Sequence, residues 1–97
     1  MKTNFHAVNF DADRKLLALI QKKLDRLEKF NDRIIDADVY LKVNNTGKQN
    51  KTVEVKVHVA GNSLVVSRDA ETFEKAMDLI YDVLKRQLKR DKEKKEK

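Results

Sequence analysis

The sequence predicts an α+β domain in two layers, with the order β-α-β-β-β-α: a four-stranded mixed sheet with two helices packed on one face. Two kinds of hydrophobic periodicity support this fold class. Between residues 53 and 59 every second residue is valine and the residues between them are polar, which is typical of a half-buried strand. In two longer segments apolar residues recur three and four positions apart, which is typical of an amphipathic helix.

The first strand and helix are predicted from the N-terminal third of the chain. Residues 2–8 alternate weakly, with Thr3, Phe5 and Ala7 on one side, and are expected to form a strand. Asp11 and Asp13 follow and are placed to cap a helix that runs to about Phe30. The buried stripe of that helix is expected to contain Leu17, Ile20, Leu24 and Leu27, with Leu16 beside it.

Three more strands and a long helix complete the predicted order. Alternation over 38–43 and over 53–59 marks two strands, and Ala60-Gly61-Asn62 marks a tight turn into a fourth. Asp69 is the expected N-cap of the last helix. Its stripe contains Phe73, Ala76, Met77, Ile80, Leu84 and Leu88. With one apolar face per strand, the sheet should be covered on one side only, its first crossover right-handed and parallel and its later pairings antiparallel. Double-stranded-RNA-binding-like folds use such an arrangement.

Nearly all of the chain's net charge of +6 is concentrated at the end of the last helix. From Val83 onward there are eight Lys or Arg residues against three acidic residues. One interpretation is an ordinary solvated helix end, since bases near a helix C-terminus complement the macrodipole. That effect fades within a turn, whereas the basic segment would extend over about four turns. The alternative interpretation is a binding site for a polyanion.

Length and composition favour a single domain over residues 1–90, followed by a basic tail, 91–97, that we expect to be disordered beyond Arg90. There is no cysteine, no apolar segment long enough to cross a bilayer and no export signal, so we expect a soluble, cytoplasmic protein. A pI near 9.6 favours acidic partners, with nucleic acid ahead of membrane.

The sequence offers weak candidates for chemistry. His6 and His58 point outward from their strands and would suggest a metal pair if those strands were neighbours, but two imidazoles make a poor zinc site. Surface histidines are the expected interpretation. Tyr40, also outward, fits either a base-stacking residue or a cover for the sheet. The carboxylate pairs Asp11 with Asp13 and Asp36 with Asp38 are better explained as helix caps and strand-edge charges. We therefore predict no catalytic residue, no metal and no cofactor.

Several segments together resemble the short ribosome hibernation-promoting factors, also called ribosome-associated translation inhibitors. The resemblance covers essentially the whole chain, with the order of strands and helices intact. The segments that carry it are KLDRL (23–27), DRI (32–34), DVYLKV (38–43), His58-Val59 with Gly61, AMDLI (76–80) and LKRQLKRDK (84–92).

The resemblance implies binding to the small ribosomal subunit and its 16S-type rRNA in slow growth or stationary phase. Such proteins occupy the groove for mRNA and for A- and P-site tRNA, and basic residues of both helices meet rRNA phosphates. The matching candidates are Lys22, Lys23, Arg26, Lys29, Lys85, Arg86, Lys89, Arg90 and Lys92. Lys22, Lys29 and Lys85 match the family pattern less closely than the others.

The resemblance also bears on partners. Longer relatives add a domain that pairs ribosomes, for which this chain has no room, so we expect a monomer off the ribosome. No membrane or small-molecule partner is expected. Alternatives are a general structured-RNA-binding or RNA-chaperone domain and a protein-interaction module whose Lys/Glu tail docks on an acidic partner. The stripe of Lys15, Lys22, Arg26 and Lys29 can also be read as a plain solvated face.

Overall fold

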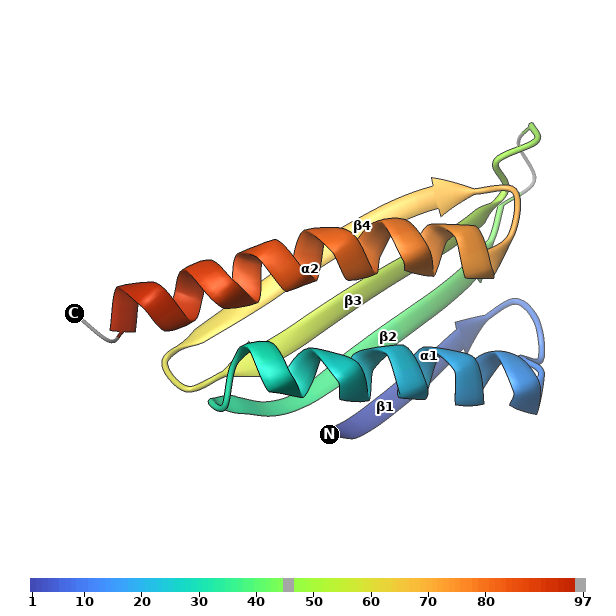
Figure 1. Ribbon diagram of the computed structural model, residues 1–97. Coiled ribbons are helices and arrows are strands. Elements are labelled where there is room, and N and C mark those ends of the chain that lie inside the picture. The colour runs from blue at the N-terminus through green and yellow to red at the C-terminus, as the bar shows by residue number, and fades with distance from the viewer. Residues whose placement is uncertain (45–46, 96–97) are drawn as a thin grey trace.

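The computed structural model describes residues 1–44 and 47–95 and has the predicted element order. Four strands form one sheet in the order β1-β2-β3-β4, and the helices lie together on one face of it (Figure 1). The elements are β1 (Lys2–Val8), α1 (Arg14–Leu27), the short 3-10 helix η1 (Glu28–Phe30), β2 (Ile34–Val43), β3 (Lys51–Val59), β4 (Asn62–Ala70) and α2 (Phe73–Lys95).

The sheet is mixed, as the sequence predicts. β1 pairs with β2 in parallel, and the β2–β3 and β3–β4 pairings are antiparallel. The register aligns Phe5 with Val39, Val39 with Val55, and Val55 with Val66. Because paired residues point to the same face of a sheet, this row of apolar side chains lies beneath the helices.

Both helices place their apolar stripes against the sheet. Figure 1 shows α1 and α2 side by side and running in the same direction, so their C-terminal ends lie at the same end of the molecule. Every apolar residue predicted for the last helix's stripe is buried, as are Ile20, Leu24 and Leu27 of α1, while Leu16 and Leu17 are partly buried. No described helix is long and apolar enough to span a membrane.

Asp13 is the N-cap of α1, where its carboxylate accepts a hydrogen bond of 3.1 Å from the backbone N–H of Lys15. The corresponding prediction for α2 is wrong. Asp69 lies in β4, where it accepts a hydrogen bond from Thr52, and α2 begins only at Phe73. The Thr72 hydroxyl accepts a hydrogen bond of 3.1 Å from the backbone N–H of Lys75, as an N-cap does.

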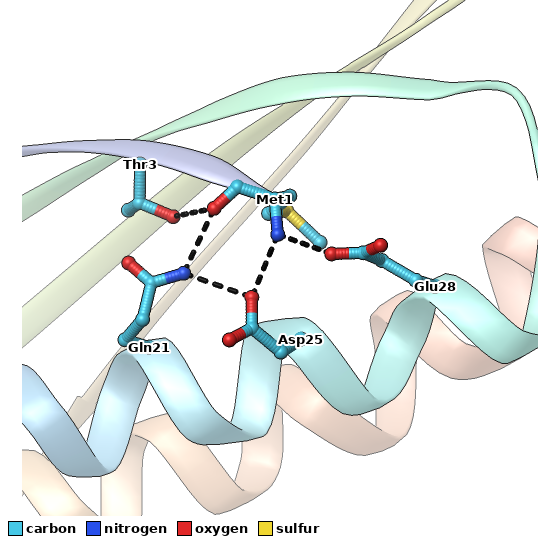
Figure 2. Close-up of polar contacts among 5 residues, drawn as sticks. All are labelled: Met1, Thr3, Gln21, Asp25 and Glu28. Atoms are coloured by element: carbon cyan, nitrogen blue, oxygen red, sulfur yellow. Dashed lines mark hydrogen bonds and ion pairs between the residues drawn. The ribbon is translucent and has the colours of Figure 1, made fainter.

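The start of β1 is fastened to the end of α1. Figure 2 shows the Met1 amino group donating hydrogen bonds to the carboxylates of Asp25, at 2.7 Å, and Glu28. Gln21 donates to the Met1 carbonyl and to Asp25, each at 2.9 Å. The bond to Asp25 is the main reason that the pKa of the Met1 amino group is raised and that of Asp25 is lowered.

The C-terminal end of α2 differs from the prediction. The helix continues to Lys95 and Asp91 is only 7% exposed, whereas the sequence favoured a domain that ends at Arg90. Disorder of the tail stays a prediction. Asp91 accepts hydrogen bonds from Asn31 and Asn62, which give the last turns of α2 a buried polar contact with the body of the domain. Residues 96 and 97 of the predicted tail lie outside the described residues.

Candidate nucleic-acid interface

Positive charge along the helical layer is neutralised at one end and left unneutralised at the other. In the first half of α2, Asp78 forms an ion pair of 2.6 Å with Lys23 of α1. Just before the helix, the Glu71 carboxylate lies 3.7 Å from the ammonium nitrogen of Lys75. Among the described residues, no ion pair is formed by Lys29 of η1, directly after α1, or by Lys85, Arg86, Lys89 and Arg90 of α2. The C-terminal ends of both helices therefore present cations that are available to an external anion.

Three of these cations gather around one aromatic ring. The ammonium nitrogens of Lys29, Lys85 and Lys89 each lie 5.1 Å from the centroid of the Phe30 ring. We call these three residues the lysine cluster. This distance is within the range of a cation–π contact, which favours ammonium groups near an aromatic face. The cluster joins a lysine from η1 to two lysines from α2, so it forms only when the two helices are packed together.

The other predicted binding residues, apart from Lys23, lie on both helices. Lys22 and Arg26 are exposed on α1, and Arg86 is exposed on α2. Arg90 lies beside Asp91 and Asn62, in a shallow hollow between α2 and the β3–β4 turn. Lys92 is half-buried and has contacts of its own.

Lys23 has a different environment from the other candidates. Its ammonium group is paired with Asp78, lies 5.8 Å from the centroid of the Tyr81 ring, and its side chain is 21% exposed. These contacts join α1 to α2. A phosphate that binds Lys23 must compete with Asp78, so the binding role of Lys23 stays a prediction. In the structure, Lys23 connects α1 to α2.

Two features of the site have no obvious signal in the sequence. Phe30 was expected only to mark the end of a helix, but its ring organises the lysine cluster. Asn31 and Asp91 are sixty positions apart and meet at 3.1 Å in a buried hydrogen bond. The available hint for Phe30 is an aromatic residue directly after a lysine at a helix end, which is too common a pattern to be selective.

The open face of the sheet holds the histidines. β1 and β3 are not neighbours but flank β2, and both histidines reach Asp38: Nε2 of His58 lies 3.2 Å and Nε2 of His6 3.6 Å from its carboxylate oxygens. The hydrogen bond to His58 is the main reason that the pKa of Asp38 is lowered. Tyr40 stacks on His6, with the ring centroids 4.7 Å apart. No group of three or more potential metal ligands occurs among residues 1–44 and 47–95.

Comparison with known proteins identifies relatives over nearly the whole chain. The family model described as "Sigma 54 modulation protein / S30EA ribosomal protein" matches residues 3–96. A ribosome hibernation promoting factor of Azotobacter vinelandii is 33% identical over 94 residues, covering 97% of this chain and 85% of that protein. A protein of the same name from Escherichia coli K12 is 31% identical over 94 residues, covering 97% and 96%.

Solved structures agree with these relatives. A ribosomal subunit interface protein from Coxiella burnetii matches with a TM-score of 0.84 and 25% identity, covering 95% of this chain and 98% of that one. The Protein Y N-terminal domain from Thermus thermophilus matches with a TM-score of 0.81 and 26% identity, covering 93% and 98%. The α+β fold and the resemblance seen in the sequence are both confirmed, and the chain belongs to the Sigma 54 modulation protein / S30EA ribosomal protein family.

Proposed function

We propose that this chain is a ribosome hibernation factor that binds the small (30S) ribosomal subunit in its mRNA and tRNA groove and inhibits translation when growth slows. Family membership and the names of the relatives support the ribosome as the partner. The observation that carries the binding surface is the lysine cluster, which lies where the end of α1 and the following η1 meet the second half of α2.

Electrostatics supplies the affinity in this mechanism. Lys and Arg side chains that neutralise rRNA phosphates release condensed counterions, which gives strong binding without base-specific contacts. Folded RNA is recognised largely through its shape and its backbone, because side chains cannot read the deep, narrow major groove of its helices. A rigid helical layer with cations at one end suits such a surface.

Inhibition in this mechanism is steric. A domain with extents of 46 × 23 × 18 Å seated in the groove would exclude mRNA and tRNA by its bulk. The mechanism requires no bond to be made or broken, and it assigns no catalytic role to any residue. It does require the domain to keep its shape while bound, and the buried core beneath the helices provides that rigidity.

The test is co-sedimentation of the purified protein with 30S subunits across a salt series, with and without bound mRNA and initiator tRNA. We expect one saturable site per subunit that these ligands compete away. Weak, non-saturating binding that ignores mRNA and tRNA would instead favour a general binder of structured RNA. No binding to RNA at physiological salt would favour a protein-interaction module.

Charge reversal at the basic end should weaken this binding. Arg86→Glu with Lys89→Glu places two carboxylates where phosphates are expected, and both side chains are exposed, so the fold should persist. We expect at least about a hundredfold loss of affinity, since several phosphate contacts are affected. Lys48→Glu with Lys75→Glu makes the same charge change away from the basic end and should cost much less. Equal losses in both double variants, with unchanged circular dichroism, would contradict the assignment.

A further inference from the structure

The lysine cluster has the composition of an anion site. Three ammonium groups are held around the Phe30 ring, and any two of their nitrogens are separated by no more than twice 5.1 Å. No carboxylate among the described residues forms an ion pair with any of the three. Like charges so close together repel, and an anion seated between them would remove that repulsion.

A buried hydrogen-bond network adjoins this cluster along the chain, at Asn31 after Phe30 and at Leu88 before Lys89. The amide nitrogen of Asn31 donates to Oδ2 of Asp91 and to the backbone carbonyl of Leu88, each at 3.1 Å. Asn62 donates to the other carboxylate oxygen of Asp91 at 3.4 Å, and the Asn31 side-chain oxygen accepts from the backbone N–H of Arg33 at 2.8 Å. Asn31 is 1% exposed, so these bonds replace water that it would otherwise contact.

Residues of the network and of the lysine cluster are neighbours along the chain. Asn31 directly follows Lys29 and Phe30, and the carbonyl of Leu88 directly precedes Lys89. The bonds from Asn31 to α2 therefore fix the distance between the chain segment that carries Lys29 and the helix that carries Lys85 and Lys89. The bond from Asn62 ties the same helix to the β3–β4 turn.

We propose that Lys29, Lys85 and Lys89 form one binding site for closely spaced phosphates, and that the Asn31–Asp91–Asn62 network is the positioning element that holds this site in shape. The inference rests on the proposed function only for the source of the phosphates, which would be the backbone of folded rRNA. A site for adjacent phosphate groups can be tested without a ribosome.

The sign of the effect of Asp91 distinguishes this role from simple electrostatics. A carboxylate near an anion site opposes anion binding by its charge, so its removal should strengthen binding if charge were its only effect. If Asp91 positions the lysines, its removal should weaken binding even though the protein becomes more positive. Glu93, exposed two residues later on the same helix, provides the matched control.

The experiment is a titration of the full chain with sodium tripolyphosphate, followed by two-dimensional NMR of the backbone amides. We expect saturable shifts centred on residues 29–31 and 85–92, abolished in Lys85→Ala with Lys89→Ala. Asp91→Ala should weaken binding about tenfold, because buried hydrogen bonds to a charged group are lost. Glu93→Ala, with the same change in charge, should strengthen binding about twofold.

Asn62→Ala keeps the test decisive if Asp91→Ala fails to fold. It removes the bond to Asp91, and a local bond accepted from the backbone N–H of Ser63, from the exposed first residue of β4 without changing charge. We expect a two- to threefold loss of affinity. Stronger binding in Asp91→Ala, equal to that in Glu93→Ala, would overturn the positioning role, as would unchanged binding in Asn62→Ala. Shifts spread evenly over all lysines would overturn the site itself.

Failure of this inference can be told apart from failure of the proposed function. Tripolyphosphate binding with the expected variant pattern, but no co-sedimentation with 30S subunits, would support the phosphate site and reject the ribosomal role. Competitive 30S binding, with Asp91→Ala behaving like Glu93→Ala in the tripolyphosphate titration, would keep the ribosomal role and reject the network as its positioning element.

Discussion

Asp38 shows how a single side chain can link three strands. It lies on β2, on the face of the sheet that no helix covers. Its carboxylate contacts His58 of β3 and accepts a hydrogen bond from Asn4 of β1, and His6 of β1 lies nearby. The lowered pKa of Asp38 records that these contacts favour its ionised form. The sequence suggests an isolated strand-edge charge, but in the structure Asp38 connects β2 to β1 and to β3 on the open face.

The pH dependence of stability should reveal this contact. Because the pKa of Asp38 is lower in the folded protein, its contribution to stability is present above the ordinary carboxyl pKa of 3.8 and is lost as pH falls through the folded value. Asp38→Asn should therefore lose less stability on acidification than the wild type. Urea unfolding between about pH 2 and pH 6 measures the difference over the window in which carboxyl groups titrate. His58→Ala should reproduce part of it, and parallel curves for Asp38→Asn and the wild type would contradict the argument.

Residues whose role depends on local pattern were predictable, and those whose role depends on distant partners were not. Asp13 caps α1 as expected, because a cap acts within three residues of itself. The link between His58 and Asp38 depends on the register between β2 and β3, which the alternation along each strand does not set. The role of Phe30 could not be predicted for the same reason, because its ring contacts two lysines of another helix.

At the scale of elements, the boundaries of α2 are the clearest departure from prediction. Asp69 seemed a suitable cap, but β4 pairs with β3 as far as Ala70, so residue 69 is held in the extended conformation. The sheet register therefore overrides local capping preference here. At the other end, a Lys- and Glu-rich segment without an apolar period stays helical as far as Lys95, with Asp91 bonded into the domain.

Substitution at Thr72 tests where α2 begins. Thr72→Ala should destabilise the protein by about 1 kcal/mol, because the N–H of Lys75 loses its side-chain acceptor. Thr72→Ser keeps a hydroxyl and should retain most of the stability. Chemical denaturation of both variants measures the difference. A loss in Thr72→Ser equal to that in Thr72→Ala would show that the hydroxyl is not the stabilising group.

At the scale of the whole molecule, the two layers present different surfaces. The helical layer ends in unneutralised cations, whereas the open face of the sheet places carboxylates beside histidines. The sequence predicted which helices carry the basic residues, because charge and apolar period are both readable along one helix. It did not predict which lysines converge, since that depends on how α1 and α2 pack and run relative to each other.

The salt dependence of binding to 30S subunits should report the lysine cluster. Lys85→Ala with Lys89→Ala should reduce the slope of log affinity against log salt by roughly 1 to 2, because two phosphate contacts and their released counterions are lost. Lys48→Ala with Lys75→Ala removes the same charge elsewhere and should leave the slope nearly unchanged. Fluorescence anisotropy of labelled protein over about 50 to 300 mM KCl gives both slopes. Equal slopes in the two double variants would argue against direct phosphate contact by the cluster.

The common direction of α1 and α2 also bears on how fast the protein finds its partner. Both helices run toward the same end of an elongated molecule, where α2 projects past α1 (Figure 1). The excess cations belong to this last part of α2. In the field of a polyanion, a body charged in this way experiences a torque as well as an attraction, and it rotates before contact. More first collisions then occur with the basic end leading, so association should be faster than charge alone would give, and most so at low ionic strength.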